Sequence, residues 1–219
     1  MRSRGLPAAV LAAASDREGG AMEVAATALD GLLELAADPS LLEEAARALL
    51  AGQPAMAPIW HLARAARGPD PPSALAGLRR QLHRDADAAV ATATAWLRER
   101  LATTPGAVAT VSHSSQVERV LRELGPGLSA APVVGVVGAD AIGPERLLNA
   151  DGTGELAGVV PTLVVATAVK LVPGEVFARL GGPGFEVVPL KAMAAVVVGP
   201  QLLSPAEAGR RAARLSAGL

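Results

Sequence analysis

The sequence contains no cysteine and no tyrosine among its 219 residues, and only 2% of the residues are aromatic. Without cysteine the chain can form no disulfide and no thiolate metal site, and it has no thiol nucleophile. With so few rings, the core must be built from leucine, valine and alanine, which pack by their branched shapes. Lysine is also scarce, because Lys170 and Lys191 are the two lysines among 20 basic residues. This composition is typical of a GC-rich bacterial genome.

The sequence also has no excess of positive or negative charge. The formal net charge is −1, the sequence pI is about 6.3, and the arginines are scattered along the chain. We therefore expect no nucleic acid and no anionic membrane among the partners. No apolar run reaches the roughly 20 residues that span a bilayer, so a cytoplasmic protein is expected. The N-terminus resembles a secretion signal, but Ala8 to Ser15 is better interpreted as the first helix.

The first half of the chain has the spacing of amphipathic helices. In residues 21–36, apolar side chains recur at steps of three and four. A second helix is expected from Ser40 to Gly52, opened by a capping box between Ser40 and Glu43. Further helices are expected at residues 54–66 and 73–101, and the last would be about 43 Å long at 1.5 Å per residue. This long helix would join the two halves of the chain.

The second half changes to short apolar runs bounded by glycine and proline, at residues 107–111, 132–138, 161–167 and 194–199. Their continuous apolar character is typical of parallel strands that are covered on both faces. The fold class is therefore α/β, with a helical N-terminal domain at residues 1–104 and a reduced Rossmann-like parallel-sheet domain at residues 105–219.

Polar side chains follow these predicted strands, where the ligand crevice of an open parallel sheet lies. They are Ser112, His113, Ser114 and Ser115 after the first strand, Asp140 after the second, and Thr167 and Lys170 after the third. The serines precede a helix, with Ser115 and Glu118 as a second expected capping box, so an oxyanion or phosphate could be held there. Each residue alone is more simply a cap, and only their convergence at one sheet edge favours a site.

No metal site and no cofactor are expected. In the segment "HRDAD" only His83 and Asp87 share a helical face, and a solvated surface explains them better than a metal ion. The segment "GGPG" at residues 181–184 lacks a phosphate-loop pattern and is interpreted as a turn. His61 is most simply a packed or capping residue.

Several motifs in order carry a resemblance to a known family. The segments are "GGAMEVAATALDGL", "QPAMAPIWHL", "VSHSSQVERVL", "GADAI", "NADGT", "VPTLVVATAVK" and "FEVVPLKAMAAVVV". Together they resemble the alpha/beta/delta-type subunits of translation initiation factor 2B and their sugar-phosphate isomerase relatives, methylthioribose-1-phosphate isomerase and ribose-1,5-bisphosphate isomerase. The resemblance implies a ligand site that includes Asp140 and the polar cluster Asn149, Gly152 and Thr153.

The chain also departs from that family. The isomerases use a cysteine together with the aspartate that corresponds to Asp140, and this sequence has no cysteine. Arginines that hold the substrate phosphate would fall at Gly19 and Gln53, and the family's lysine after Asn149 is Ala150. The connection between Leu124 and Pro132 is short, where the family has about two more strand-helix units. The resemblance is therefore to a shortened and divergent member.

Two functions follow as hypotheses. The first is a non-catalytic or ligand-binding protein that holds a phosphorylated sugar or nucleotide at residues 112–115, near Asp140 and Asn149. The alternative is an aldose-ketose isomerase in which Asp140 works with His113, whose titration range suits that role. Asp140 could also be only an inherited turn residue. Proteins of the family that this chain resembles pair through the C-terminal domain, and the chain keeps the segment "FEVVPLKAMAAVVV" with its apolar run Ala194 to Val198. The resemblance therefore implies a homodimer through that domain.

Overall fold

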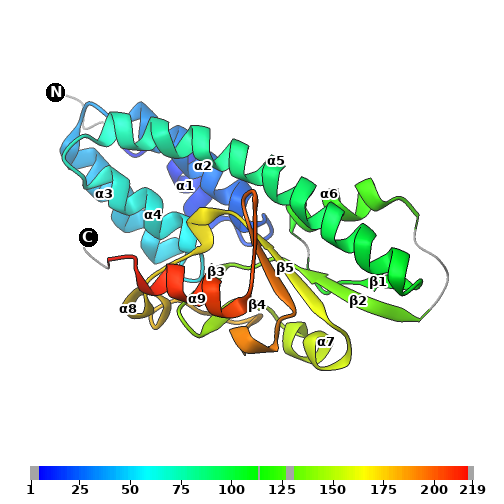
Figure 1. The fold of residues 1–219 in the computed structure, drawn as a ribbon. Coiled ribbons are helices and arrows are strands. Elements are labelled where there is room, and N and C mark those ends of the chain that lie inside the picture. The colour runs from blue at the N-terminus through cyan, green and yellow to red at the C-terminus, as the bar shows by residue number, and fades with distance from the viewer. Residues whose placement is uncertain (1–4, 113, 127–130, 217–219) are drawn as a thin grey trace.

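Helices form the first half of the chain in the structure, a computed structural model that describes residues 5–112, 114–126 and 131–216 (Figure 1). They are α1 (Ala8–Ser15), α2 (Ala21–Glu34), α3 (Pro39–Gly52), α4 (Ala57–Ala66) and α5 (Pro71–Thr103). The first helix has the bounds predicted from the sequence. Leucine and alanine side chains fill the core between these helices, as the shortage of aromatic residues requires.

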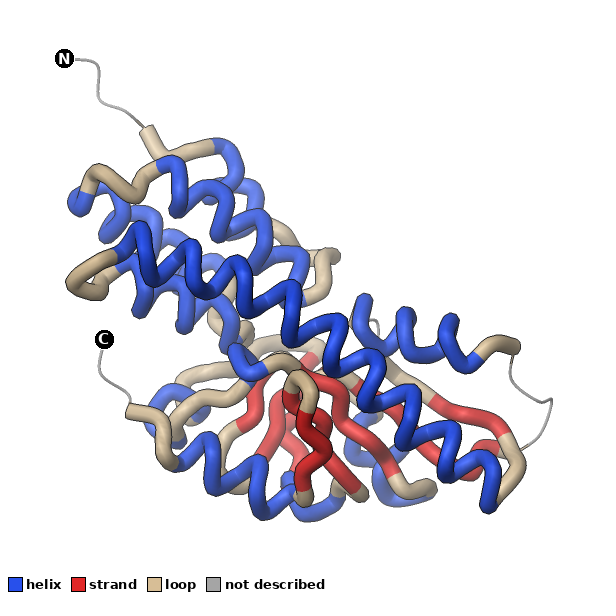
Figure 2. The backbone as a smooth tube through the Cα atoms, turned by 45° about the horizontal axis from the view of Figure 1, so that its top comes forward, coloured by secondary structure: helices blue, strands red, loops and turns tan. Residues whose placement is uncertain are grey.

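Helix α5 extends over both halves of the molecule (Figure 2). It has 33 residues, and the carboxylate of Asp70 caps its start by accepting a hydrogen bond from the backbone N–H of Ser73 at 3.2 Å. Leu75 and Leu82 are buried against the other helices. Further along, Val90 and Leu97 are buried against the sheet. None of the helices in the described part of the chain has both the length and the apolar character of a bilayer span.

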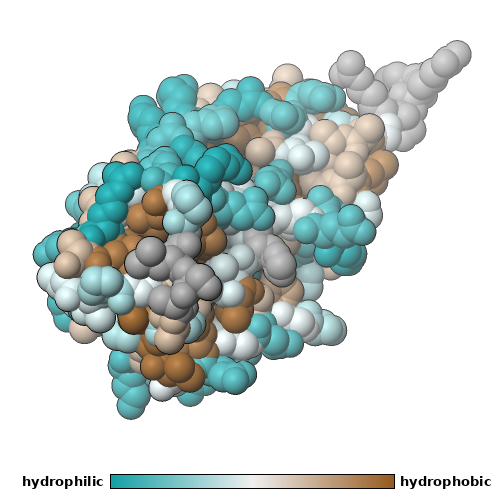
Figure 3. Space-filling view, turned by 90° about the vertical axis from the view of Figure 1, so that its right-hand side faces the viewer, coloured by the Kyte–Doolittle hydropathy of each residue, from teal (hydrophilic) through white to brown (hydrophobic). Residues whose placement is uncertain are grey.

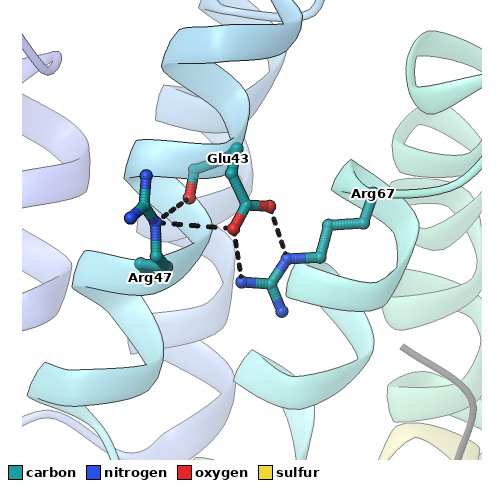
Figure 4. A network of polar contacts seen from close by, with 3 residues as sticks. All are labelled: Glu43, Arg47 and Arg67. Carbon is teal, nitrogen blue, oxygen red and sulfur yellow. Dashed lines mark hydrogen bonds and ion pairs between the residues drawn. The ribbon is translucent and has the colours of Figure 1, made fainter.

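The start of α3 differs from the predicted capping box. Asp38 is the N-cap, and its carboxylate accepts hydrogen bonds from the backbone N–H groups of Ser40 and Leu41, each at 3.2 Å. The helix therefore begins before Ser40, which leaves Glu43 outside the first turn. The Glu43 carboxylate instead binds the guanidinium of Arg67, at 2.6 and 3.0 Å, and Arg47 lies beside it (Figure 4). A prediction from local sequence alone missed this link between α3 and the end of α4.

The main sheet has the strand order β1-β2-β5-β7-β8. Its strands are β1 (Ala107–Ala109), β2 (Pro132–Val137), β5 (Thr162–Ala166), β7 (Ala195–Val198) and β8 (Gln201–Leu203). The first four are parallel and coincide with the four predicted runs, whereas β8 is antiparallel to β7. Helices α5 and α6 (Ser115–Leu124) bury one face. Helix α9 (Pro205–Ala213) and a second sheet bury the other, which confirms the predicted α/β class.

The second sheet was not predicted. It is antiparallel, with the order β3-β4-β6, and consists of β3 (Ala141–Ile142), β4 (Arg146–Ala150) and β6 (Phe185–Pro189). Its strands are short or carry polar residues within them, so they lack the continuous apolar run that marks a buried parallel strand. Short helical segments connect the two sheets, namely α7 (Thr153–Val159), η1 (Ala168–Lys170), α8 (Gly174–Phe177) and η2 (Leu190–Ala192).

Strand β1 is an outer strand of the main sheet. Figure 3 looks onto this end of the molecule, where apolar surface is exposed. A groove of about 430 Å³ opens between the end of α5, β1 and the end of α6. Its lining includes Leu101, Val108, Leu121 and Leu124. An outer strand beside apolar side chains is a place where other chains can pair unless it is covered.

The contact between α1 and α3 requires glycine at position 52. A Cβ atom on Gly52 would lie 2.2 Å from the backbone carbonyl oxygen of Ala14. We expect Gly52→Ala to lower the free energy of unfolding by about 1 to 3 kcal/mol, because backbone must move to relieve the clash. Gly77→Ala in α5 is the matched control: nothing lies within 4 Å of its Cβ position, and we expect a gain of about 1 kcal/mol in helix propensity. Urea denaturation of both variants tests this, and equal stabilities would contradict it.

Candidate functional site

A cavity of about 240 Å³ lies at the carboxyl end of the main sheet. The connection between α1 and α2 forms one side of it, and the ends of β1, β2 and β5 lead into the other. Its lining includes six residues that were singled out from the sequence: Ser112, Ser114, Ser115, Asp140, Asn149 and Lys170. The polar residues that follow separate predicted strands therefore do meet at one edge, as parallel topology implies.

The turn that precedes α6 is held by Ser112. Its hydroxyl oxygen accepts hydrogen bonds from the backbone N–H groups of Gly138, at 3.1 Å, and Ser114, at 3.3 Å. This ties the end of β1 to the end of β2. Glycine is needed at 138 because a Cβ atom there would lie 2.9 Å from the Cβ of Ser114. His113, the other candidate catalytic residue, lies outside the described residues.

The capping box predicted for Ser115 and Glu118 is not formed. Ser114 is the N-cap of α6, so Ser115 is already the first helical residue and Glu118 lies one position too late. No side chain caps this end. Because the first amides of a helix have no partner within the helix, the start of α6 presents free N–H groups beside the cavity.

A second helix starts at the same cavity. Gly20 is the N-cap of α2, also without a side-chain cap, and residues 19–22 all line the cavity. The start of each helix carries a partial positive charge from the aligned peptide dipoles. Two such ends at one cavity favour an anionic group in it.

Asp140 and Lys170 form a buried pair on the cavity wall. The Asp140 backbone N–H donates to the carbonyl of Leu148 at 2.8 Å, and its carbonyl accepts from the N–H of Ala57 at 3.1 Å. Lys170 Nζ lies 3.9 Å from Asp140 Oδ1, and the two side chains are 5% and 17% exposed, respectively. Burial raises the pKa of Asp140, and the Lys170 charge only partly offsets this. Burial lowers the pKa of Lys170, against the attraction of Asp140. Both groups are therefore shifted towards their neutral forms.

Three other predicted residues lie behind the cavity lining. Thr153 Oγ1 accepts a hydrogen bond from Asn149 Nδ2 at 2.9 Å and donates to the Ala150 carbonyl at 2.7 Å, so it orients Asn149. Gly152 is the N-cap of α7 and has a φ of 91°, in the left-handed region. Thr167 is buried, and its hydroxyl lies 3.5 Å from the sulfur of Met22, which does line the cavity. These residues position the site without facing it.

The resemblance placed Gly19 and Gln53 at the site, but sequence reasoning did not predict that Asp16, Arg17, Glu18 and Gly20 would also line the cavity. Asp16 Oδ1 accepts hydrogen bonds from the N–H groups of Glu18 and Gly19, at 2.9 and 2.8 Å, which forms a tight turn. Gln53 Nε2 donates to the carbonyls of Ala13 and Asp16, each at 2.7 Å, and fixes this turn to the end of α3. The spacing of Asp16 and Gly19 is the available local signal, and it indicates only a turn.

Arg17 also lines the cavity, although Gly19 and Gln53 carry no charge where the family's arginines would fall. Its guanidinium donates to the carbonyls of Ala14 and Asp16, at 3.1 and 2.9 Å. In the described part of the chain, no group of three or more histidine, aspartate or glutamate side chains is placed to hold a metal ion. The cavity is therefore lined by backbone amides, hydroxyls, the buried pair of Asp140 and Lys170, and the charged turn residues Asp16, Arg17 and Glu18.

No family model matches the sequence, and no curated protein matches it significantly. Solved structures do match. A Pyrococcus horikoshii OT3 structure described as translation initiation factor eIF-2B aligns with a TM-score of 0.70 and 19% identity, over 92% of this chain and 99% of that chain.

The chain has the fold of the eIF-2B subunits.

Two further neighbours agree with this fold. The eIF2B-beta2-delta2 complex from C. thermophilum aligns with a TM-score of 0.67 and 12% identity, over 92% of this chain and 91% of that chain. The eIF2B beta subunit from Chaetomium thermophilum aligns with a TM-score of 0.64 and 12% identity, over 94% of this chain and 89% of that chain. The predicted likeness to this fold is confirmed. The likeness to the isomerases and the shortening of the chain stay predictions, because identities this low concern the fold alone.

The segment that follows Lys170 is held by His61, which gives the fold a dependence on pH. The Nε2–H of His61 donates to the Leu171 carbonyl at 2.8 Å. Burial lowers the pKa of His61 below 6.5, against the effect of this hydrogen bond. Between 6.5 and that lower pKa the unfolded chain binds a proton that the folded chain does not, so this contribution to stability is lost as the pH falls through this window.

We expect His61→Gln to remove that part of the pH dependence. The free energy of unfolding of the wild type should fall between pH 7 and pH 5 by more than that of the variant. The same substitution at the exposed His83 is the control for the exchange of histidine for glutamine. Parallel slopes for the wild type and His61→Gln in urea titrations would show that His61 does not contribute.

Proposed function

We propose that the chain binds a small phosphorylated sugar in the cavity at the carboxyl end of the sheet and does not isomerise it. The observation that carries this proposal is the meeting of two uncapped helix starts, those of α2 and α6, at one cavity. Free amides and helix dipoles bind phosphate without any guanidinium group. The phosphate would lie at Ser114 and Ser115, and the sugar hydroxyls would face Asp140 and Asn149.

The size of the cavity favours a sugar phosphate over a nucleotide. Its volume of about 240 Å³ is smaller than the roughly 300 to 1,000 Å³ of pockets that enclose larger ligands. Ser112, Ser114 and Ser115 supply hydroxyl groups, and Asn149 and Asp140 supply oxygen acceptors. A small sugar phosphate has a phosphate at one end that the serine hydroxyls can bind, and hydroxyl groups at the other end that can donate to Asn149 and Asp140.

Loss of isomerisation is supported by what the sequence lacks. There is no cysteine to act with Asp140, and positions 19 and 53 carry no arginine. The alternative function keeps one supporting observation, because the raised pKa of Asp140 suits a general acid or base. Measurable interconversion of an aldose and a ketose phosphate by the wild type, lost in Asp140→Asn, would establish that alternative and refute the proposal.

The phosphate position can be tested by placing a negative charge at the start of α6. Ser115→Asp should leave the helix intact, since an acidic residue in the first turn is favourable, but its carboxylate should repel a phosphate. With ribose 5-phosphate at about 100 times its dissociation constant, the wild type should gain about 2.7 kcal/mol of stability and the variant little.

The matched control for this thermal-shift experiment is Ser73→Asp. It adds the same charge to the first turn of α5, where Ser73 is exposed and lies outside the cavity lining. It should respond to ribose 5-phosphate like the wild type. Equal stabilisation of both variants by the ligand would place the phosphate somewhere other than α6.

Assembly is the second part of the proposed function. Most of the apolar run Ala194 to Val198, which is part of the segment behind the predicted homodimer, forms the inner strand β7 of the main sheet, where Ala195 to Val198 are buried. It therefore cannot supply an interface. An apolar groove of about 530 Å³ is available beside the outer strand β6 instead, lined by Pro144, Phe177, Leu180 and Val187. We propose that a second copy of the chain binds there.

This homodimer is consistent with the C. thermophilum neighbour, which is described as a tetrameric complex of beta and delta subunits. Val187 is 48% exposed, so Val187→Glu should weaken the dimer without unfolding the chain. Val159→Glu, at a 75% exposed position outside this groove, is the control and should leave the mass unchanged. Light scattering of the wild type at micromolar concentration should give twice 22.0 kDa, and a monomer mass would refute the proposal.

A further inference from the structure

The two lysines of the chain lie in opposite environments. Lys191 is exposed, whereas Lys170 is buried and is one of the residues that line the cavity. Elsewhere the chain meets its need for positive charge with arginine, which is the other basic residue. Lysine differs from arginine in one chemical respect that matters here: it can lose its proton and become a nucleophile. A lysine in the cavity therefore offers chemistry that an arginine would not.

The surroundings of Lys170 favour that chemistry. Its nearest charged partner is Asp140, and 3.9 Å is too long for a hydrogen bond. Among the described residues, none forms a hydrogen bond with Lys170 Nζ. Burial lowers the pKa of Lys170 and raises that of Asp140. The pair can therefore exist as a neutral amine beside a carboxylic acid, the combination that carbonyl addition needs.

We propose that Lys170 captures the carbonyl group of a sugar phosphate in the cavity as a reversible imine, with Asp140 moving the protons. The proposal rests on the proposed function, because the phosphate is held at the starts of α6 and α2. The open-chain aldehyde or ketone then lies against Lys170. Such capture holds a ligand covalently and does not by itself isomerise it.

The step balances in atoms and charge. The neutral amine of Lys170 adds to the carbonyl carbon and forms a C–N bond, while the carbonyl oxygen takes the proton of the Asp140 carboxylic acid. The resulting carboxylate removes one proton from the nitrogen and returns it to the hydroxyl, so that water leaves as the C–O bond breaks. The products are a protonated imine on Lys170, the Asp140 carboxylate and one water. Hydrolysis by the reverse path releases the ligand.

Reductive trapping tests the proposal. The wild-type protein is incubated with ribose 5-phosphate and sodium cyanoborohydride, which reduces a protonated imine to a stable secondary amine, and the adduct is located by peptide mass spectrometry. We expect more adduct on Lys170 than on Lys191, because burial lowers the pKa of Lys170 and so raises the fraction of its amine that is neutral. An adduct on Lys191 that equals or exceeds the one on Lys170 would overturn the proposal.

Variants separate capture from binding. Lys170→Arg keeps the positive charge but removes the nucleophile, so the Lys170-derived adduct should disappear while Lys191→Arg leaves trapping on Lys170 unchanged. Ribitol 5-phosphate has no carbonyl group and reports binding alone by thermal shift. If it stabilises the wild type but ribose 5-phosphate leaves no adduct on Lys170, the imine is refuted and the proposed function stands. If neither ligand stabilises the protein and no adduct forms, both are refuted.

Discussion

The burial of one long helix against two different partners is the constraint on which the rest of the structure depends. Helix α5 packs its first half against α2 and α4 and its second half against strands β2, β5 and β7. The hydrophobic effect fixes both contacts at once, so the helical layer and the sheet take one position relative to each other. The connection between α1 and α2 is thereby brought to the carboxyl end of the sheet, where it completes the cavity.

Backbone N–H groups at helix starts are a main source of polar groups in this cavity. The starts of α2 and α6 supply backbone amides to the cavity, and Asp140 and Lys170 form a buried ion pair in its wall. A guanidinium group is mobile and must be held by its neighbours, whereas an amide at a helix start is fixed by the helix itself. The glycine at position 19 and the glutamine at position 53 are compatible with anion binding for this reason, although neither carries a charge.

The parallel sheet could be predicted from the sequence because its strands are continuous apolar runs, a pattern that burial on both faces imposes. The polar residues of the site could be predicted as well, since parallel topology brings the ends of those strands to one edge. The antiparallel sheet could not, because β3 has two residues and β4 includes Arg146 and Asn149. Both capping boxes failed for a related reason. A helix begins directly after its N-cap residue. The N-caps of α3 and α6 are Asp38 and Ser114, which precede the predicted N-caps Ser40 and Ser115.

The backbone of Asp140 is held on both sides, by Leu148 of the second sheet and by Ala57 at the start of α4. Its place in the molecule therefore does not depend on its own side chain. A change of the Asp140 side chain would therefore act first on Lys170, because it would leave that buried cation without a counter-charge. At this point of the cavity wall, backbone atoms set the position of the residue and its side chain sets the charge.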